Sequence, residues 1–158
     1  MVALRKEVPS RKRILVPLDG TGWSERAIPY AAELAHQHHA ELVLLHIYRE
    51  PAREFAPDII LAGQESQIDH SRDQVQNHFR GLRNELRQQN LDVDVQWIEG
   101  TGVTRQISDY INEQDVDMVV MATHHRKGLA LALYGSVARD VIKNVHIPVT
   151  LITPEKDY

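Results

Sequence analysis

RILVPLDG, at residues 13–20, is the stretch of sequence that decides the fold. Ile14 to Leu18 is an unbroken apolar run, which is typical of a strand that is buried on both faces of a sheet. Pro17 cannot donate a backbone hydrogen bond to a neighbouring strand, so we expect the strand to end as Asp19-Gly20 begins a turn. A buried strand that leads through a turn into a helix is the first half of a βαβ unit.

Strand-length apolar runs alternate with longer amphipathic segments along the rest of the chain. Further strands are expected at residues 42–47, 93–97, 118–122 and 149–152, the last with Pro148 at its start. The runs at 42–47 and 118–122 are apolar throughout, which indicates burial between helix layers. Val93, Val95 and Trp97 alternate with polar residues instead, which predicts a strand at an edge of the sheet. The whole pattern predicts an α/β fold with a mostly parallel sheet.

Four helices are expected between these strands. In the first, alanines recur at helical spacing with Leu34, Ser24 is the expected N-cap, and Pro29 is expected to cause a local kink. This helix is expected to end near residues 36–39. Residues 49–63, which hold two prolines and a glycine, are interpreted as a loop.

The other helices follow from the spacing of their apolar residues. Residues 65–89 carry one apolar stripe in an otherwise polar segment, which predicts a long helix on the surface of the sheet. A further helix is expected from Val103 to Ile111 after a turn at Gly100 to Gly102, and a last one from Gly135-Ser136 onward. The last helix is expected to bury Val137, Val141 and Ile142.

Composition limits the class of protein. Of the 158 residues, 42% are hydrophobic and 25% are charged, as expected for one globular domain. The absence of cysteine excludes disulfides, thiolate metal sites and thiol catalysis. A formal net charge of −4 provides no basic field to attract nucleic acid, and the basic residues within 1–13 are interpreted as a solvated tail.

No segment indicates secretion or a membrane. The basic amino terminus is not followed by an apolar region, and the longest apolar runs are far shorter than the roughly 20 residues that span a bilayer. We therefore expect a cytoplasmic protein with no membrane partner. Residues 1–10 are expected to form a flexible tail and residues 11–154 one domain.

The expected ligand site follows from the topology. A sheet with helices on both faces reverses its winding direction at one place, which leaves a crevice beyond the carboxyl ends of two neighbouring strands. The turns after the buried strands, residues 19–23 and 123–134, are candidates to line it. Gly135-Ser136 begins a helix there, and its free N–H groups favour a phosphate. Asp19 suits a sugar hydroxyl or a magnesium ion.

These residues also have purely structural interpretations. Gly135-Ser136 can serve as a helix cap, and Asp19-Gly20 can form only a tight turn. Their combination at one topological position favours a ligand site. The histidines at 36, 38 and 39 fall at a helix end without a carboxylate cluster, so a metal site is not predicted there. His124 and His125 have no evident nucleophile as partner, so no catalytic residue is predicted.

Five segments in order carry a family resemblance. They read RILVPLDG at 13–20, AAELA at 31–35, ELVLLHI at 41–47, DVDMVVM at 115–121 and GSVA at 135–138. Together they resemble the universal stress protein family, from about Arg11 to Thr153. The resemblance implies an adenine-nucleotide α-hydrolase-like fold, with a five-stranded parallel sheet ordered 3-2-1-4-5 and helices on both faces. It also implies a homodimer that pairs through the last strand, formed by Val149, Thr150, Leu151 and Ile152.

The resemblance further implies ATP or a related adenine nucleotide as ligand, with or without magnesium. By position, Asp19 would meet the ribose or a nucleotide-bound magnesium ion, Pro17 and Ile47 would lie beside the adenine, and Met121 would contact the base. Gly135, Ser136 and Val137 would hold the phosphates. The predicted nucleotide-binding residues are Pro17, Leu18, Asp19, Ile47, Met121, Ala122, His125, Arg126, Gly128, Gly135, Ser136 and Val137.

The sequence departs from the phosphate motif of the family, which reads Gly-x-x-Gly, nine residues, Gly-Ser/Thr. Ala122 and His125 stand at the first two glycine positions, although the spacing to Gly135-Ser136 is kept. If residue 125 must take a positive φ, a side chain there costs roughly 1 to 2 kcal/mol, and its ring occupies space that a phosphate needs. In compensation, a histidine can donate to phosphate oxygens, and Arg126 and Lys127 add positive charge.

Two functions of different class follow from these observations. The first is a noncatalytic, nucleotide-binding protein of the stress response or of signalling. The alternative is a dimeric interaction protein of the same fold that no longer binds nucleotide. A slow ATP hydrolase is a third hypothesis, for which the sequence identifies no general base.

Overall fold

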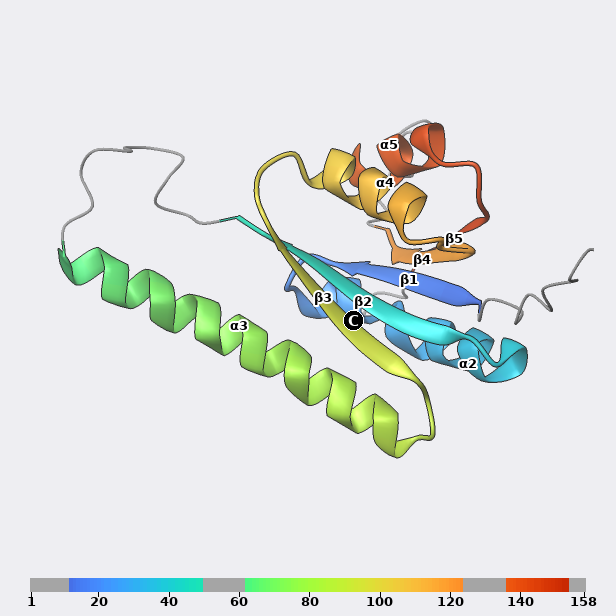
Figure 1. The fold of residues 1–158 in the computed structure, drawn as a ribbon, viewed down its shortest axis with the longest axis horizontal. Coiled ribbons are helices and arrows are strands. Elements are labelled where there is room, and N and C mark those ends of the chain that lie inside the picture. Colours follow the sequence, from blue (N-terminus) through green and yellow to red (C-terminus); the bar gives the residue numbers. More distant parts are fainter. Residues whose placement is uncertain (1–11, 50–61, 124–135, 154–158) are drawn as a thin grey trace, which may run out of the picture.

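The computed structural model describes residues 12–49, 62–123 and 136–153, with the backbone alone for 62–70. Within these ranges five strands form one sheet (Figure 1). The strands are β1 (Arg13–Leu18), β2 (Glu41–Tyr48), β3 (Val93–Glu99), β4 (Met118–Ala122) and β5 (Val149–Ile152). All four pairings are parallel, and the strand order is β3-β2-β1-β4-β5. The predicted strand order, and the edge position of β3, are confirmed.

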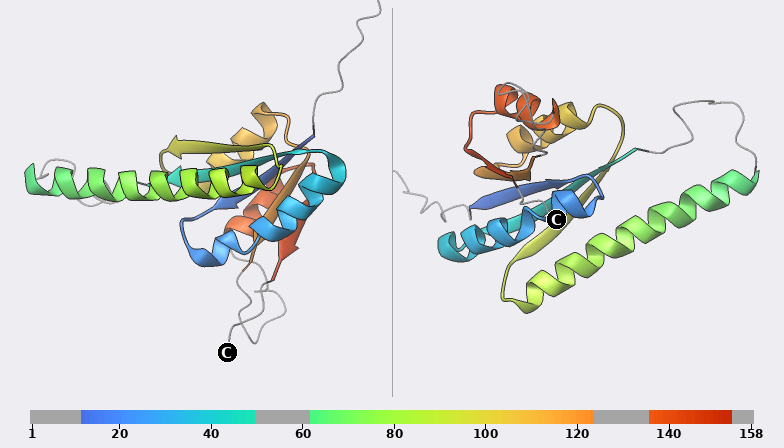
Figure 2. Two further views of the ribbon diagram at one scale, coloured as in Figure 1. Left: turned by 90° about the horizontal axis from the view of Figure 1, so that it is seen from below. Right: turned by 180° about the vertical axis from the view of Figure 1, so that it is seen from behind.

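Helices cover both faces of this sheet. The helices in the described ranges are α1 (Gly22–Glu25), α2 (Ile28–His38), α3 (Ala62–Gln88), α4 (Val103–Glu113) and α5 (Ser136–Asn144). In Figure 1, α2 and α3 lie below the sheet and α4 and α5 lie above it, and the two views of Figure 2 show the same two layers. The predicted layering of helix, sheet and helix is confirmed.

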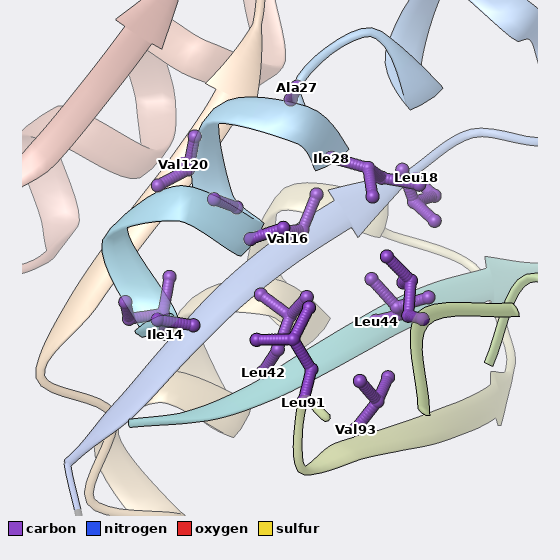
Figure 3. Close-up of a cluster of buried hydrophobic side chains, with 14 of the residues drawn as sticks. Ile14, Val16, Leu18, Ala27, Ile28, Leu42, Leu44, Leu91, Val93 and Val120 are labelled. Atoms are coloured by element: carbon purple, nitrogen blue, oxygen red, sulfur yellow. The ribbon is translucent and has the colours of Figure 1, made fainter. Parts of the chain in front are cut away.

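Alternating side chains divide the core between the two faces. Ile14 and Val16 of β1 pack with α2, α3 and Val120 in the cluster of Figure 3. Leu15, which lies between them in sequence, packs with α4 and α5 on the other face. Because successive residues of a strand point to opposite faces, each strand residue contributes to one of these clusters. A fully buried aliphatic side chain contributes roughly 1.5 to 3 kcal/mol, so both faces stabilise the sheet.

The first predicted helix is two helices in the structure. Thr21, rather than Ser24, is the N-cap of α1, and the Thr21 side chain accepts a hydrogen bond from the Ser24 amide. Pro29 does not kink a continuous helix, because it lies in the first turn of α2. Backbone N–H groups in the first turn have no hydrogen-bond partner within the helix, so proline loses no bond there. The expected N-cap at Ser24 was therefore wrong, because a threonine three residues earlier already fills that role.

Two further expectations differ from the structure. Helix α3 begins at Ala62, inside the segment predicted as a loop. Ile142 of α5 is exposed, whereas Ala138 and Val141 are buried. Successive residues of a helix are 100° apart, and Ile142 is turned away from the face that Ala138 and Val141, three residues apart, direct toward the sheet.

This difference provides a stability test on adjacent residues of one helix. Val141 is 0% exposed and Ile142 is 42% exposed. We expect Val141→Ala to lower the free energy of unfolding by about 1.5 to 3 kcal/mol, because it removes buried methyl groups and leaves a cavity. Ile142→Ala should change it by less than about 0.5 kcal/mol. Urea denaturation of both variants measures the difference, and equal losses would contradict the assigned helix face.

The sheet reverses its winding direction between β1 and β4. The chain runs from β1 to β2 and β3 on one side, then returns to β4 and β5 on the other side of β1. The register joins β1 and β4 at Ile14–Met118 and Leu15–Val119, whereas β1 and β2 pair along the whole of β1. The carboxyl-terminal halves of β1 and β4 therefore lie beyond their shared ladder.

Pro17 explains where this ladder stops. The Arg13 carbonyl accepts from the Asp117 amide at the start of β4, so Arg13, Leu15 and Pro17 direct their backbone groups toward β4. Proline has no N–H, and the next ladder bond from β1 to β4 therefore has no donor. The strand nevertheless continues to Leu18, because the residues that face β2 keep their hydrogen bonds.

Candidate functional site

A pocket of about 700 Å³ lies where β1 and β4 pass beyond their shared ladder. It is lined by the carboxyl ends of β1, β2 and β4, by α1 and α4, and by the first turn of α5. A crevice at the carboxyl ends of the strands, at the reversal of the winding direction, is where open α/β sheets bind ligands. Its volume is within the range of small-molecule sites, roughly 300 to 1,000 Å³.

The turn after β1 places a carboxylate at one side of the pocket. Asp19 Oδ1 accepts hydrogen bonds from the Thr21 amide at 2.8 Å and from the Thr21 hydroxyl at 2.6 Å. Gly20 has a φ of +85°, a conformation that strains any residue with a side chain. The predicted tight turn at Asp19-Gly20 is therefore present. The carboxylate both supports this turn and lines the pocket.

Trp23 joins the two strands that separate at the crevice. Its indole Nε1 donates to the Thr123 carbonyl, just after β4, at 3.1 Å. The Arg26 guanidinium lies 5.0 Å from the centre of the Trp23 ring, within the range of a cation–π contact. On the same turn, the Ser24 hydroxyl donates to the Thr21 carbonyl and accepts from the Asp19 amide. These bonds connect the turn after β1 to the end of β4.

Apolar side chains form the middle of the pocket. Pro17, Leu45, Ile47 and Met121 come from three neighbouring strands, and Ile107 comes from α4. Leu45, Ile47 and Met121 belong to the core cluster on the α4 and α5 face. A flat apolar ligand group can replace water here without leaving polar protein atoms unpaired.

The lining of the pocket also includes two arginines and the start of a helix. Ser136 is the first residue of α5, and the first turn of this helix contains no acidic residue. Arg139 lines the pocket one turn further, and Arg49 lines it just after β2. The N–H groups of a helix start together with guanidinium groups favour a bound anion.

Sequence reasoning missed several lining residues although their spacing was a usable signal. Arg49 follows Ile47 by two residues, so both belong to one face of an extended chain. Arg139 follows Ser136 by three residues, so both belong to one face of a helix. Applying the strand spacing of two residues to Ile47 and the helix spacing of three residues to Ser136 would have found both arginines. Trp23 and Thr123 lie in the two turns that were predicted to line the crevice, and the remaining lining residues outside the predicted set are Ser24, Leu45, Val103, Ile107 and Ala138.

The predicted site residues divide into two groups. Those that line the pocket are Pro17, Leu18, Asp19, Ile47, Met121, Ala122, Ser136 and Val137. His125, Arg126, Gly128 and Gly135 lie outside the described residues. Ala122 is the last residue of β4, where it is paired with Ile152 and has no positive φ. An alanine therefore fits the backbone at the first glycine position of the family motif.

His46 supports the pocket turn from the other face of the sheet. It is only 7% exposed, and its ring packs beside Phe79 and Trp97. Its Nδ1 lies 2.9 Å from the Leu18 carbonyl, the last carbonyl of β1. Because a carbonyl can only accept, Nδ1 carries the proton of this bond. Burial lowers the pKa of His46, although the bond to Leu18 and the charge of Asp19 oppose that shift.

The lowered pKa of His46 predicts a pH dependence of stability. Below its ordinary pKa of 6.5, the unfolded chain binds a proton that the folded chain resists, so folding stability falls as pH falls. His46→Asn keeps a donor for Leu18 and cannot titrate. We expect the stability of the wild type, relative to this variant, to fall by up to about 1.4 kcal/mol per pH unit below pH 6.5.

Chemical denaturation from pH 7.5 to 5 measures this difference. The other histidines are present in both proteins, so their titration cancels. A stability difference that stays constant over this range would show that His46 has the same proton affinity in the folded and unfolded chain.

The described residues show neither a metal-binding cluster nor a membrane-spanning helix. No group of three or more His, Asp or Glu side chains in these ranges is arranged to hold a metal ion. His39 ends α2 in the left-handed conformation, with its amide bonded to the Ala35 and His36 carbonyls, so the histidine-rich segment does form a helix end. None of the helices in the described ranges has the length and apolar content to cross a membrane.

The sheet order and the crevice define a doubly wound α/β domain. The model of the universal stress protein family matches residues 10–153, and the chain belongs to this family. It is 25% identical over 148 residues to the universal stress protein MJ0531 of Methanocaldococcus jannaschii, covering 92% of this chain and 84% of that protein. It is 26% identical over 144 residues to the universal stress protein YxiE of Bacillus subtilis, covering 89% of this chain and 97% of that protein.

Solved structures show the same fold. The hypothetical protein MJ0577 superposes with a TM-score of 0.73 at 22% identity, over 92% of this chain and 98% of that one. A universal stress protein in complex with cAMP gives a TM-score of 0.57 at 18% identity, over 90% and 97%. The universal stress protein of Archaeoglobus fulgidus in complex with dAMP gives a TM-score of 0.58 at 18% identity, over 90% of this chain and 98% of that one.

Proposed function

We propose that the protein binds ATP or a related adenine nucleotide in the crevice between β1 and β4, in a noncatalytic role in stress response or signalling. The observation that carries the proposal is the combination of surfaces in one pocket: a carboxylate, apolar side chains and a helix start with an arginine. Ribose, base and phosphate have matching chemistry. Two structural neighbours are complexes with the adenine nucleotides cAMP and dAMP, which supports the same ligand class.

Each part of the nucleotide has a proposed partner. Pro17, Ile47 and Met121 would hold the adenine, and Asp19 would accept from a ribose hydroxyl. The phosphates would bind the start of α5 at Ser136 and Val137, with Arg139 as an additional cation. His125, Arg126, Gly128 and Gly135 are proposed to complete the phosphate site.

Magnesium is proposed to enter only with the nucleotide. Asp19 is the one acidic residue that lines the pocket within the described ranges. One carboxylate with phosphate oxygens and water is sufficient for magnesium, which retains several waters. Asp19 would thus be an outer ligand to a metal ion that the phosphates carry.

Calorimetric titration of the purified protein tests the proposal. After denaturation to identify released nucleotide and removal of any ligand, we expect saturable binding of ATP, AMP or cAMP. Arg139→Ala should weaken binding by roughly 10- to 100-fold, because a hydrogen bond to a charged group contributes about 1.5 to 3 kcal/mol. The matched control is Arg105→Ala on α4, whose side chain is 88% exposed and bonded within its own helix to Asp109. Its affinity should equal that of the wild type.

The absence of binding at millimolar nucleotide would overturn the proposal and favour the alternative, an interaction protein of the same fold. Ala122 and His125, at the glycine positions of the family motif, are the observation that supports this alternative. His125→Gly then separates two causes. If the histidine ring excludes phosphate, the variant gains affinity; if affinity stays absent, the defect lies elsewhere in the site.

We further propose that two copies pair through β5. This strand has β4 as its neighbour on one side and forms an edge of the sheet. The Pro148 and Ile152 carbonyls accept hydrogen bonds from β4, and by alternation the backbone groups of Val149 and Leu151 face the open edge. Thr150 and Ile152 direct their backbone groups toward β4.

Sedimentation analysis of two substitutions at one position tests the dimer. Leu151→Pro removes an edge-facing N–H and should shift the protein toward monomer. Leu151→Ala loses similar packing but keeps the N–H, and should remain dimeric. A dimer that survives Leu151→Pro would place the contact elsewhere.

A further inference from the structure

A second pocket, of about 660 Å³, lies on the face of the sheet opposite the crevice. Its walls are α2 and the carboxyl-terminal part of α3, which Figure 2 shows on the same side of the sheet. We call it the α2–α3 groove. Each of these helices packs on the sheet, and the groove lies between them.

The floor of the α2–α3 groove is apolar. Ile28 and Ala32 of α2 and Leu86 of α3 are nearly buried and belong to the main core, and Leu82 is partly buried beside them. Ile28 and Ala32 are four residues apart, as are Leu82 and Leu86, so each helix contributes one apolar stripe. Of these four side chains, Leu82 is the one that stays partly exposed, so it is the apolar contact open to a further helix.

Three carboxylates line the groove together with His36, and the Glu25 carboxylate contacts His78 of α3. Glu25 and Glu33 line it from the α1 and α2 side, and Glu85 lines it from α3. No lysine or arginine is among its lining residues in the described ranges. An occupant of the groove therefore meets negative charge on both sides of an apolar floor, which favours a cationic partner.

We propose that the α2–α3 groove docks a basic amphipathic helix of a partner protein. Both walls are helices, whose backbone groups are bonded internally, so the groove offers no strand edge for an extended peptide. A helix with an apolar stripe would place that stripe on Leu82 and Leu86. Lysine or arginine side chains on its flanks would meet Glu33 and Glu85. The site is separate from the nucleotide crevice and does not depend on nucleotide binding.

Fluorescence anisotropy with designed peptides tests the docking proposal. The probe is a labelled 14-residue helical peptide with leucines on one face and lysines on the flanks, about 21 Å long and so long enough for three to four turns. We expect micromolar binding that weakens as salt is raised. A peptide with glutamate in place of lysine should bind at least tenfold more weakly.

Substitutions on the protein distinguish the groove from other acidic surfaces. The double variant Glu33→Lys, Glu85→Lys should lose roughly tenfold in affinity for the basic peptide and gain affinity for the acidic one. The control, Asp109→Lys with Glu113→Lys, makes the same change of net charge at two exposed residues of α4 on the other face and should have no effect. An equal loss in both variants would indicate attraction by net charge and overturn the docking site.

Deletion of residues 1–11 tests whether the amino-terminal segment of the chain itself occupies the groove. These residues are basic and include an apolar stretch at Met1 to Leu4, so they are a possible competitor within the chain. Unchanged affinity after the deletion supports a partner helix as the occupant. Tighter peptide binding after the deletion would mean that the amino-terminal segment occupies the groove and would overturn the proposal.

Discussion

The hydrogen-bond ladder between β1 and β4 stops halfway along both strands, and the crevice depends on where it stops. Pro17 faces β4 and has no N–H to donate, so the pairing ends at Leu15–Val119. The strand continues because its β2-facing residues keep their bonds. Beyond Leu15 the two carboxyl ends need a different connection, and the bond from the Trp23 indole to the Thr123 carbonyl supplies one across the pocket mouth.

The two faces of the sheet have separate roles that meet at the end of β1. The crevice and the proposed nucleotide site lie on the α4 and α5 face, whereas His46 and its aromatic neighbours lie on the α2 and α3 face. The bond from His46 to the Leu18 carbonyl joins them, because Asp19 follows Leu18 directly. The buried imidazole of His46 thereby supports the turn that carries the Asp19 carboxylate of the pocket.

Much of the site could be predicted because strands and helices repeat regularly. The apolar run in β1 and the helix start at Ser136 predicted two sides of the crevice, and the carboxyl end of β4 predicted a third. The lining residues that no local pattern indicated come from an element whose facing is set by packing: Val103 and Ile107 of α4. A local pattern does not say which side of a helix or turn will meet a strand that is distant in the sequence.

The sequence by itself determined the α/β class and the position of most elements. Through Pro17 and Asp19-Gly20 it also determined where the first strand ends and the turn begins. These are local properties: a missing donor, a positive φ and a repeating apolar pattern. Tertiary structure alone decided that Ile142 is exposed beside the buried Val141 and that the Trp23 indole reaches the Thr123 carbonyl. Such facing results from how whole elements pack on a shared sheet.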